Sequence, residues 1–204
     1  MSEDVTTFDG ITVTTPARTC LDLMRERRLV EAVVVADAFL YAGLIDRTEL
    51  AIFCENRYRW PGIRQARLAV SLSSAFARSP GETRLRMVLV LAGFEQPLVN
   101  VPVVDASGAH VATPDLQVRG RRWAWLEYDG AYHDTADQHA ADVRRENRLA
   151  VASGGVPVLR YDKGHLTSAR RGAVVAEVAR ATGWSRLSDL QPVDFALPPR
   201  AHAW

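Results

Sequence analysis

Lysine is almost absent from this 204-residue chain: Lys163 is the single lysine among 25 basic residues, and the rest are arginines. The planar guanidinium fork of arginine suits carboxylates and phosphates, but a bias in genome base composition explains the same excess equally well. Because 24 acidic residues nearly balance the basic ones, the formal net charge is only +1, and no global basic field indicates nucleic acid. A nucleic-acid partner would have to bind to a local basic patch.

Cysteines and long apolar runs are also scarce. Cys20 and Cys54 stand apart among apolar neighbours, which excludes the paired spacing of a zinc site and the dense pattern of a disulfide scaffold. No stretch approaches the ~18 apolar residues that span a bilayer, and residues 1–10 are acidic and polar, unlike a signal peptide. We therefore expect a cytoplasmic protein with buried, reduced thiols that is neither exported nor embedded in a membrane.

The first third of the chain carries helix signals. Hydrophobic residues make up 48% of the whole chain, enough for a packed core. The ends of the expected helices are marked by capping residues, prolines and glycines, namely Thr15 with Pro16, Gly43, and Asp46 with Glu49. A further helix is expected at 63–72. We predict a helical domain over residues 1–75, followed by a short polar boundary up to Ser79.

The rest of the chain mixes helix and strand signals and predicts an α+β protein. A capping box at Ser79 and Glu82 opens a helix that Gly93 ends. Period-2 runs and turn residues then predict strands and two more helices, in the order strands 97–104, 109–118 and 122–130, helix 135–153, strand 156–162 and helix 168–182. We expect a domain over 79–184 with a mixed sheet flanked by helices, and a loosely ordered tail over 185–204.

Acidic residues at strand ends are the candidate site. Alternation along the strand 122–130 places Glu127 and Asp129 on one face. Matching polar to polar on the preceding strand puts Asp115 opposite Glu127, which requires a three-residue loop of Gly120, Arg121 and Arg122. A loop one residue shorter or longer would put the carboxylates on opposite faces.

Clustered carboxylates in a half-buried site repel one another and lose solvation unless a cation neutralises them. Hard oxygen ligands select Mg²⁺ or Mn²⁺, an ion that can activate water and stabilise charge on a phosphodiester. Asp115 and Glu127 are the expected ligands, and the nearby His133 is suited to orient a water or to hold a phosphate.

A set of motifs between Ser79 and Gly183 resembles the endonuclease-like domain related to the very-short-patch mismatch-repair endonuclease, a family of the PD-(D/E)XK nuclease superfamily. The motifs are Pro114-Asp115, Glu127-Tyr128-Asp129-Gly130, His133, the helical segment 142–149 and the strand 156–162. The upstream segment 13–23 resembles the region that links a winged-helix module of the abortive-infection antitoxin type to such a nuclease domain.

The resemblance implies a restriction-endonuclease-like fold and Mg²⁺- or Mn²⁺-dependent hydrolysis of DNA. Asp115 and Glu127 match the metal-binding acids, Glu82 matches an acidic residue of the leading helix that assists, and Asp129 and His133 match the residues that manage the water. Asp129 stands two residues after Glu127, where the superfamily usually has a lysine. No winged helix precedes the segment, so we expect target recognition from a protein partner or a separate winged-helix module.

Other interpretations of these residues stay open. Arginines of one helix and of the hairpin loop could bracket a phosphate backbone or form an ordinary solvated face, namely Arg144, Arg145 and Arg148 with Arg121 and Arg122. Glu82 could simply cap its helix, and Asp129 and His133 could be turn and surface residues. The chain could then be a catalytically silent DNA-binding antitoxin or regulator, or an interaction module with a solvated acidic rim.

Overall fold

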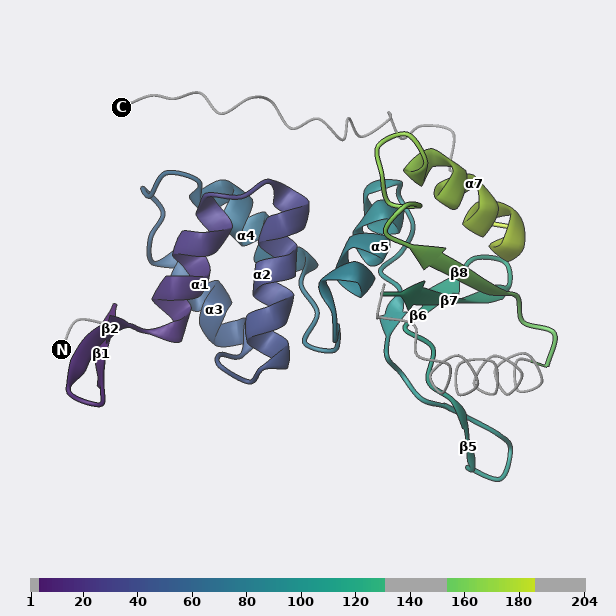
Figure 1. Ribbon diagram of the computed structural model, residues 1–204, viewed down its shortest axis with the longest axis horizontal. Coiled ribbons are helices and arrows are strands. Elements are labelled where there is room, and N and C mark those ends of the chain that lie inside the picture. Colours follow the sequence, from purple (N-terminus) through teal and green to yellow (C-terminus); the bar gives the residue numbers. More distant parts are fainter. Residues whose placement is uncertain (1–3, 131–153, 186–204) are drawn as a thin grey trace. The chain divides into compact units, whose positions relative to one another are not determined.

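The computed structural model describes residues 4–130 and 154–185, and it divides into two compact units between Thr83 and Arg84. Its described part contains six helices, a four-stranded mixed sheet and two two-stranded ribbons (Figure 1). The prediction of an α+β protein is therefore confirmed. The predicted helix at 135–153 and nearly all of the predicted tail lie outside the described residues.

Four helices pack together in the first unit: α1 (Pro16–Arg25), α2 (Leu29–Tyr41), α3 (Arg47–Glu55) and α4 (Ile63–Leu72). The predicted caps are present. Thr15 Oγ1 accepts a hydrogen bond from the Arg18 N–H, and Asp46 and Glu49 form a reciprocal capping box at the start of α3. These contacts satisfy N–H groups that have no partner inside a helix, so the helix starts follow from local sequence.

A β-hairpin precedes the helices, where sequence analysis expected no element. Strands β1 (Val5–Phe8) and β2 (Ile11–Thr14) pair antiparallel around Asp9 and Gly10. Both turn residues have positive φ, 47° and 79°, which is the geometry that an Asp-Gly pair favours in a two-residue hairpin. The signal, an Asp-Gly pair between two runs rich in threonine and β-branched residues, was present in the sequence.

The second unit is built on a sheet with strand order β3 (Leu98–Val99), β6 (Leu116–Arg119), β7 (Trp123–Asp129) and β8 (Val158–Asp162). The first three strands pair antiparallel and β8 runs parallel to β7, so the sheet is mixed, as predicted. Helix α7 (Arg171–Thr182) packs on β7. The hydroxyl of Tyr161 on β8 donates to Glu177 of α7 at 3.1 Å, which identifies the face of the sheet that α7 covers.

The prediction of single strands at 97–104 and 109–118 was wrong in detail, because each run is broken into two strands. Asn100 has a φ of 51°, which bends the chain out of the extended conformation, and Pro114 offers no N–H for a ladder. The second half of the first run, β4 (Val103–Val104), pairs with the first half of the second run, β5 (His110–Ala112), in a separate two-stranded ribbon. The predicted turn at Asp105–Gly108 connects these two strands.

Candidate functional site

The β6–β7 hairpin has the register predicted from the sequence. Leu116 pairs with Leu126 and Arg119 pairs with Trp123, which leaves a three-residue loop from Gly120 to Arg122. Paired residues of neighbouring strands point to the same face of a sheet. Continued by one residue beyond the start of β6, this register places Asp115 opposite Glu127.

Asp115 is held by the main chain on both of its sides. Its carbonyl oxygen accepts from the Asn100 N–H at 3.0 Å, and its carboxylate oxygen Oδ2 accepts from the Tyr128 N–H at 2.8 Å. The half-buried carboxylate thus reaches across to the main chain of β7 at the residue next to Glu127. A hydrogen bond to a charged acceptor is stronger than a neutral one and fixes the direction of this side chain.

Glu127 is a buried acid in the middle of the sheet, with 5% of its surface exposed. Burying a carboxylate is costly unless charged or hydrogen-bonding groups compensate it. The register of the parallel neighbour β8 pairs Glu127 with a basic residue, Arg160. Both side chains therefore stand on the same face of the sheet.

The end of this face is acidic. Asp129, the exposed last residue of β7, pairs with Asp162, the exposed last residue of β8. The ring atom Nδ1 of His165 lies 2.8 Å from Asp162 Oδ1, and the His165 N–H donates to the same oxygen at 3.1 Å. These hydrogen bonds, that of the ring first, hold the pKa of Asp162 below its ordinary value of 3.8.

Arg160, Asp162 and His165 were not among the candidate residues from the sequence. A signal existed, since residues 156–161 are otherwise apolar, contain one arginine and are followed directly by an aspartate. The sequence did not show which strand lies beside these residues. The parallel pairing with β7 joins segments separated by about thirty residues of chain, and no local pattern specifies it.

Glu82 has the contacts of a helix cap. It lies in the first turn of α5 (Pro80–Leu91), where its N–H donates to Ser79 Oγ at 3.2 Å and its carboxylate accepts from the Arg78 N–H at 3.0 Å. The predicted capping box is therefore half present, with the return bond at Arg78 instead of Ser79. These are the contacts of a helix cap, the alternative role that the sequence left open for Glu82.

Of the two arginines named in the hairpin loop, Arg122 caps a helix and Arg121 lines a pocket. Arg122 donates from Nε to the Ala181 carbonyl at 2.6 Å and from Nη2 to the Arg180 carbonyl at 3.0 Å, so it caps the C-terminal end of α7. Arg121 is exposed and lines an open pocket of about 480 Å³ together with Arg119 and Trp184. This pocket lies at the loop end of the hairpin, and none of the candidate acids lines it.

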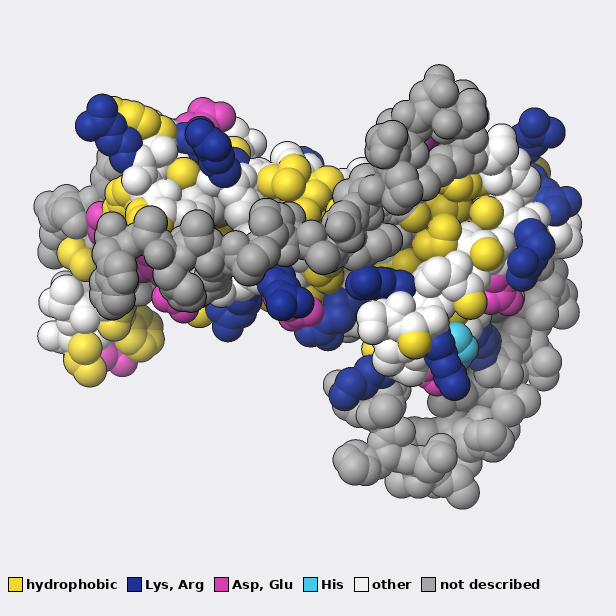
Figure 2. Space-filling model, turned by 90° about the horizontal axis from the view of Figure 1, so that it is seen from above, with side chains coloured by type: hydrophobic (Ala, Val, Ile, Leu, Met, Phe, Trp, Pro, Cys, Tyr) yellow, Lys and Arg dark blue, Asp and Glu magenta, His cyan; other side chains and the backbone are white. Residues whose placement is uncertain are grey.

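The remaining predicted site residues, His133, Arg144, Arg145 and Arg148, lie outside the described residues. On the face shown in Figure 2, the basic side chains of the described residues stand in separate groups with acidic side chains among them. That distribution fits the near-zero net charge of the chain.

A divalent cation fits part of the predicted donor set. Within residues 4–130 and 154–185 no group of three or more histidine, cysteine, aspartate or glutamate side chains is placed to hold a metal. Mg²⁺, however, is commonly held by only one or two carboxylates, with water and substrate phosphate completing the octahedron. Asp115 and Glu127 offer two carboxylates, and the β6–β7 register continued by one residue sets them opposite each other.

Comparison of the chain with models of known protein families, with curated proteins and with solved structures finds no match. In the part of the chain that the structure describes, no helix is long and apolar enough to cross a membrane.

Proposed function

We propose that this protein is a Mg²⁺- or Mn²⁺-dependent DNA endonuclease with a restriction-endonuclease-like second unit. One observation supports the proposal: the β6–β7 register, continued by one residue, brings Asp115 opposite the buried Glu127, and the Tyr128 N–H of β7 donates to the Asp115 carboxylate. The mixed sheet and the motif resemblance support the same interpretation. A DNA substrate also implies a cytoplasmic location, where the free, buried Cys20 and Cys54 stay reduced.

In this proposal Asp115 and Glu127 hold the cation. When bound, the ion would supply a Lewis acid for the phosphodiester and a more acidic water for the attack. The chain itself provides the rest. The Tyr128 N–H keeps the Asp115 carboxylate turned toward β7, and burial in the sheet keeps the Glu127 side chain in one position. Asp129, at the exposed end of the same strand, would accept a proton from water.

The alternative is a DNA-binding protein without catalysis that keeps this scaffold. The contacts of Glu82 favour it, because this residue, which was expected to assist catalysis, caps its own helix. Activity with a metal ion separates the two functions.

The test is cleavage of plasmid, duplex and single-stranded DNA by the purified full chain with Mg²⁺, Mn²⁺, Ca²⁺ or EDTA. We expect nicking with Mg²⁺ or Mn²⁺, and its loss in Asp115→Asn and in Glu127→Gln, while DNA affinity stays the same or rises because fewer negative charges face the phosphates. Glu95→Gln, at an exposed acid of the same unit, is the matched control and should cleave like the wild type. Wild-type activity no higher than that of Glu127→Gln would refute the nuclease.

A further inference from the structure

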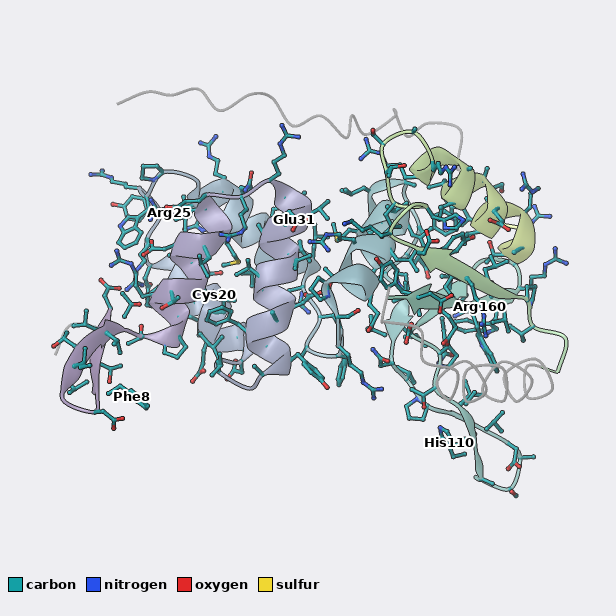
Figure 3. The ribbon with its side chains drawn as sticks, viewed as in Figure 1. Phe8, Cys20, Arg25, Glu31, His110 and Arg160 are labelled. Carbon is teal, nitrogen blue, oxygen red and sulfur yellow. The ribbon has the colours of Figure 1, made fainter. Side chains whose placement is uncertain are left out.

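Arg160 stands in the middle of a sheet face that carries the candidate acids. It lies halfway along β8, is partly buried, and pairs with Glu127 across the parallel ladder (Figure 3). On one side of this pair, Trp125 and Val158 pack against apolar residues of the β4–β5 ribbon. The face is thus apolar around Trp125 and Val158, carries Arg119 beside Trp123 at the loop end, and is charged again at and beyond the pair of Glu127 and Arg160.

The contacts of α7 show which way Arg160 points. Consecutive residues of a strand face opposite sides of the sheet. Tyr161, the next residue, donates its hydroxyl hydrogen bond to Glu177 of α7. Arg160 therefore points away from α7, toward the same side as Glu127.

The charges on this face create a difficulty for a DNA substrate. Asp115, Glu127, Asp129 and Asp162 all belong to the face or its end. The register sets Arg160 among them, whereas Arg119 stands farther along the same face, beside Trp123. A phosphodiester is itself an anion, so it approaches such a set of carboxylates only if positive charge meets it. One divalent ion shared between two carboxylates is largely neutralised by its own ligands, which leaves the phosphate charge to another group.

We propose that Arg160 binds the scissile phosphate through two parallel N–H···O hydrogen bonds from its guanidinium group. This inference rests on the proposed nuclease function and adds a substrate-binding residue to it. Arginine presents a fixed, planar set of donors that matches two phosphate oxygens, which the point charge of a lysine does not. Anchored beside Glu127, the guanidinium group would hold the phosphate next to the Asp115–Glu127 pair.

The rival explanation is that Arg160 only compensates the charge of the buried Glu127. Either basic side chain could do that, so Arg160→Lys separates the two roles and Arg160→Gln removes both. Arg64→Gln, at an exposed arginine of α4, is the control for losing one positive charge. The two measurements are the single-turnover cleavage rate with Mg²⁺ and the salt dependence of duplex binding with Ca²⁺ in place of Mg²⁺.

For Arg160→Gln we expect a cleavage rate lower by about 10²-fold, the usual effect of losing one preorganised donor to a developing charge. Its plot of log affinity against log salt should flatten by about 0.9, the contribution of one phosphate contact. Arg160→Lys should keep the salt slope but cleave roughly tenfold more slowly than the wild type, because it lacks the second donor. Arg64→Gln should leave the cleavage rate unchanged.

The possible failures are distinguishable. A wild type that cleaves DNA while Arg160→Gln keeps its rate and salt slope overturns the role of Arg160 and leaves the nuclease standing. Full wild-type cleavage by Arg160→Lys also overturns the two-bond contact, and this variant decides the matter if Arg160→Gln does not fold. A wild type that binds DNA with the Arg160-dependent slope but never cleaves refutes the nuclease alone, and one that neither binds nor cleaves refutes both.

Discussion

The hydrogen bond from the Tyr128 N–H to Asp115 should make a measurable contribution to stability that is separate from any role in catalysis. Its length is 2.8 Å and its acceptor is a carboxylate. Hydrogen bonds to charged groups contribute about 1.5–3 kcal/mol, and the half-exposed position of Asp115 places this one near the lower limit. We therefore expect Asp115→Ala to lower the free energy of unfolding by about 1–2 kcal/mol.

Asp115→Asn should behave differently. Its amide oxygen can still accept from the Tyr128 N–H, and a neutral hydrogen bond has roughly half the strength of a charged one. The asparagine variant should therefore lose only about 0.5–1 kcal/mol of stability. It should nevertheless lose metal-dependent cleavage as completely as the alanine variant, because it has lost the charge that a cation needs.

Two measurements without metal test the stability part of this prediction. Urea denaturation gives the free energy of unfolding for both variants, with Glu95→Ala as an exposed acid whose removal should change stability by less than about 0.5 kcal/mol. Hydrogen exchange at the Tyr128 amide should accelerate in Asp115→Ala and much less in Asp115→Asn. An alanine variant as stable as Glu95→Ala, with unchanged protection of the Tyr128 amide, would show that the contact does not hold the hairpin.

Three further predictions concern backbone space, thiols and metal binding. Gly120→Ala should lower the free energy of unfolding in urea by about 1–3 kcal/mol, because the added Cβ would lie 2.8 Å from Thr182 at the end of α7. Gly172→Ala, in α7 with open space around the added Cβ, should raise it by about 0.5–1 kcal/mol. A loss of stability in both variants would contradict this prediction. Burial raises the pKa of Cys20 to about 12 and that of Cys54 to about 11, so native thiols should react slowly with a disulfide reagent at pH 8. Stability should fall as pH rises above the ordinary thiol pKa of 9.0, where only the unfolded chain ionises, and fast native labelling would refute the burial argument. Millimolar Mg²⁺ should raise the melting temperature of the wild type and not that of Glu127→Gln, and an equal rise in both would place the ion elsewhere.

Local interactions determined the features that sequence analysis predicted correctly. The starts of α1 and α3 depend on side chains that cap N–H groups three residues away, as at Thr15 and Asp46. The register of the β6–β7 hairpin depends on the length of one short loop and on matching polar faces, so the pairing of Leu116 with Leu126 and of Arg119 with Trp123 followed from a short stretch of sequence. Such features need no knowledge of the rest of the chain.

Tertiary structure decided the identity of the groups around the acids. Arg160 lies beside Glu127 only because β8 pairs parallel with β7, and a parallel pair requires a long connection whose outcome no local pattern specifies. The bend at Asn100 similarly depends on the chain leaving one sheet for another. The charges of Glu82 and Arg122 suit both a functional site and a helix cap. Only their contacts with the Arg78 N–H and with the carbonyl groups of α7 showed that both residues cap helices. The sequence shows what kind of group a charged side chain can bind, and the tertiary structure determines which such group lies near it.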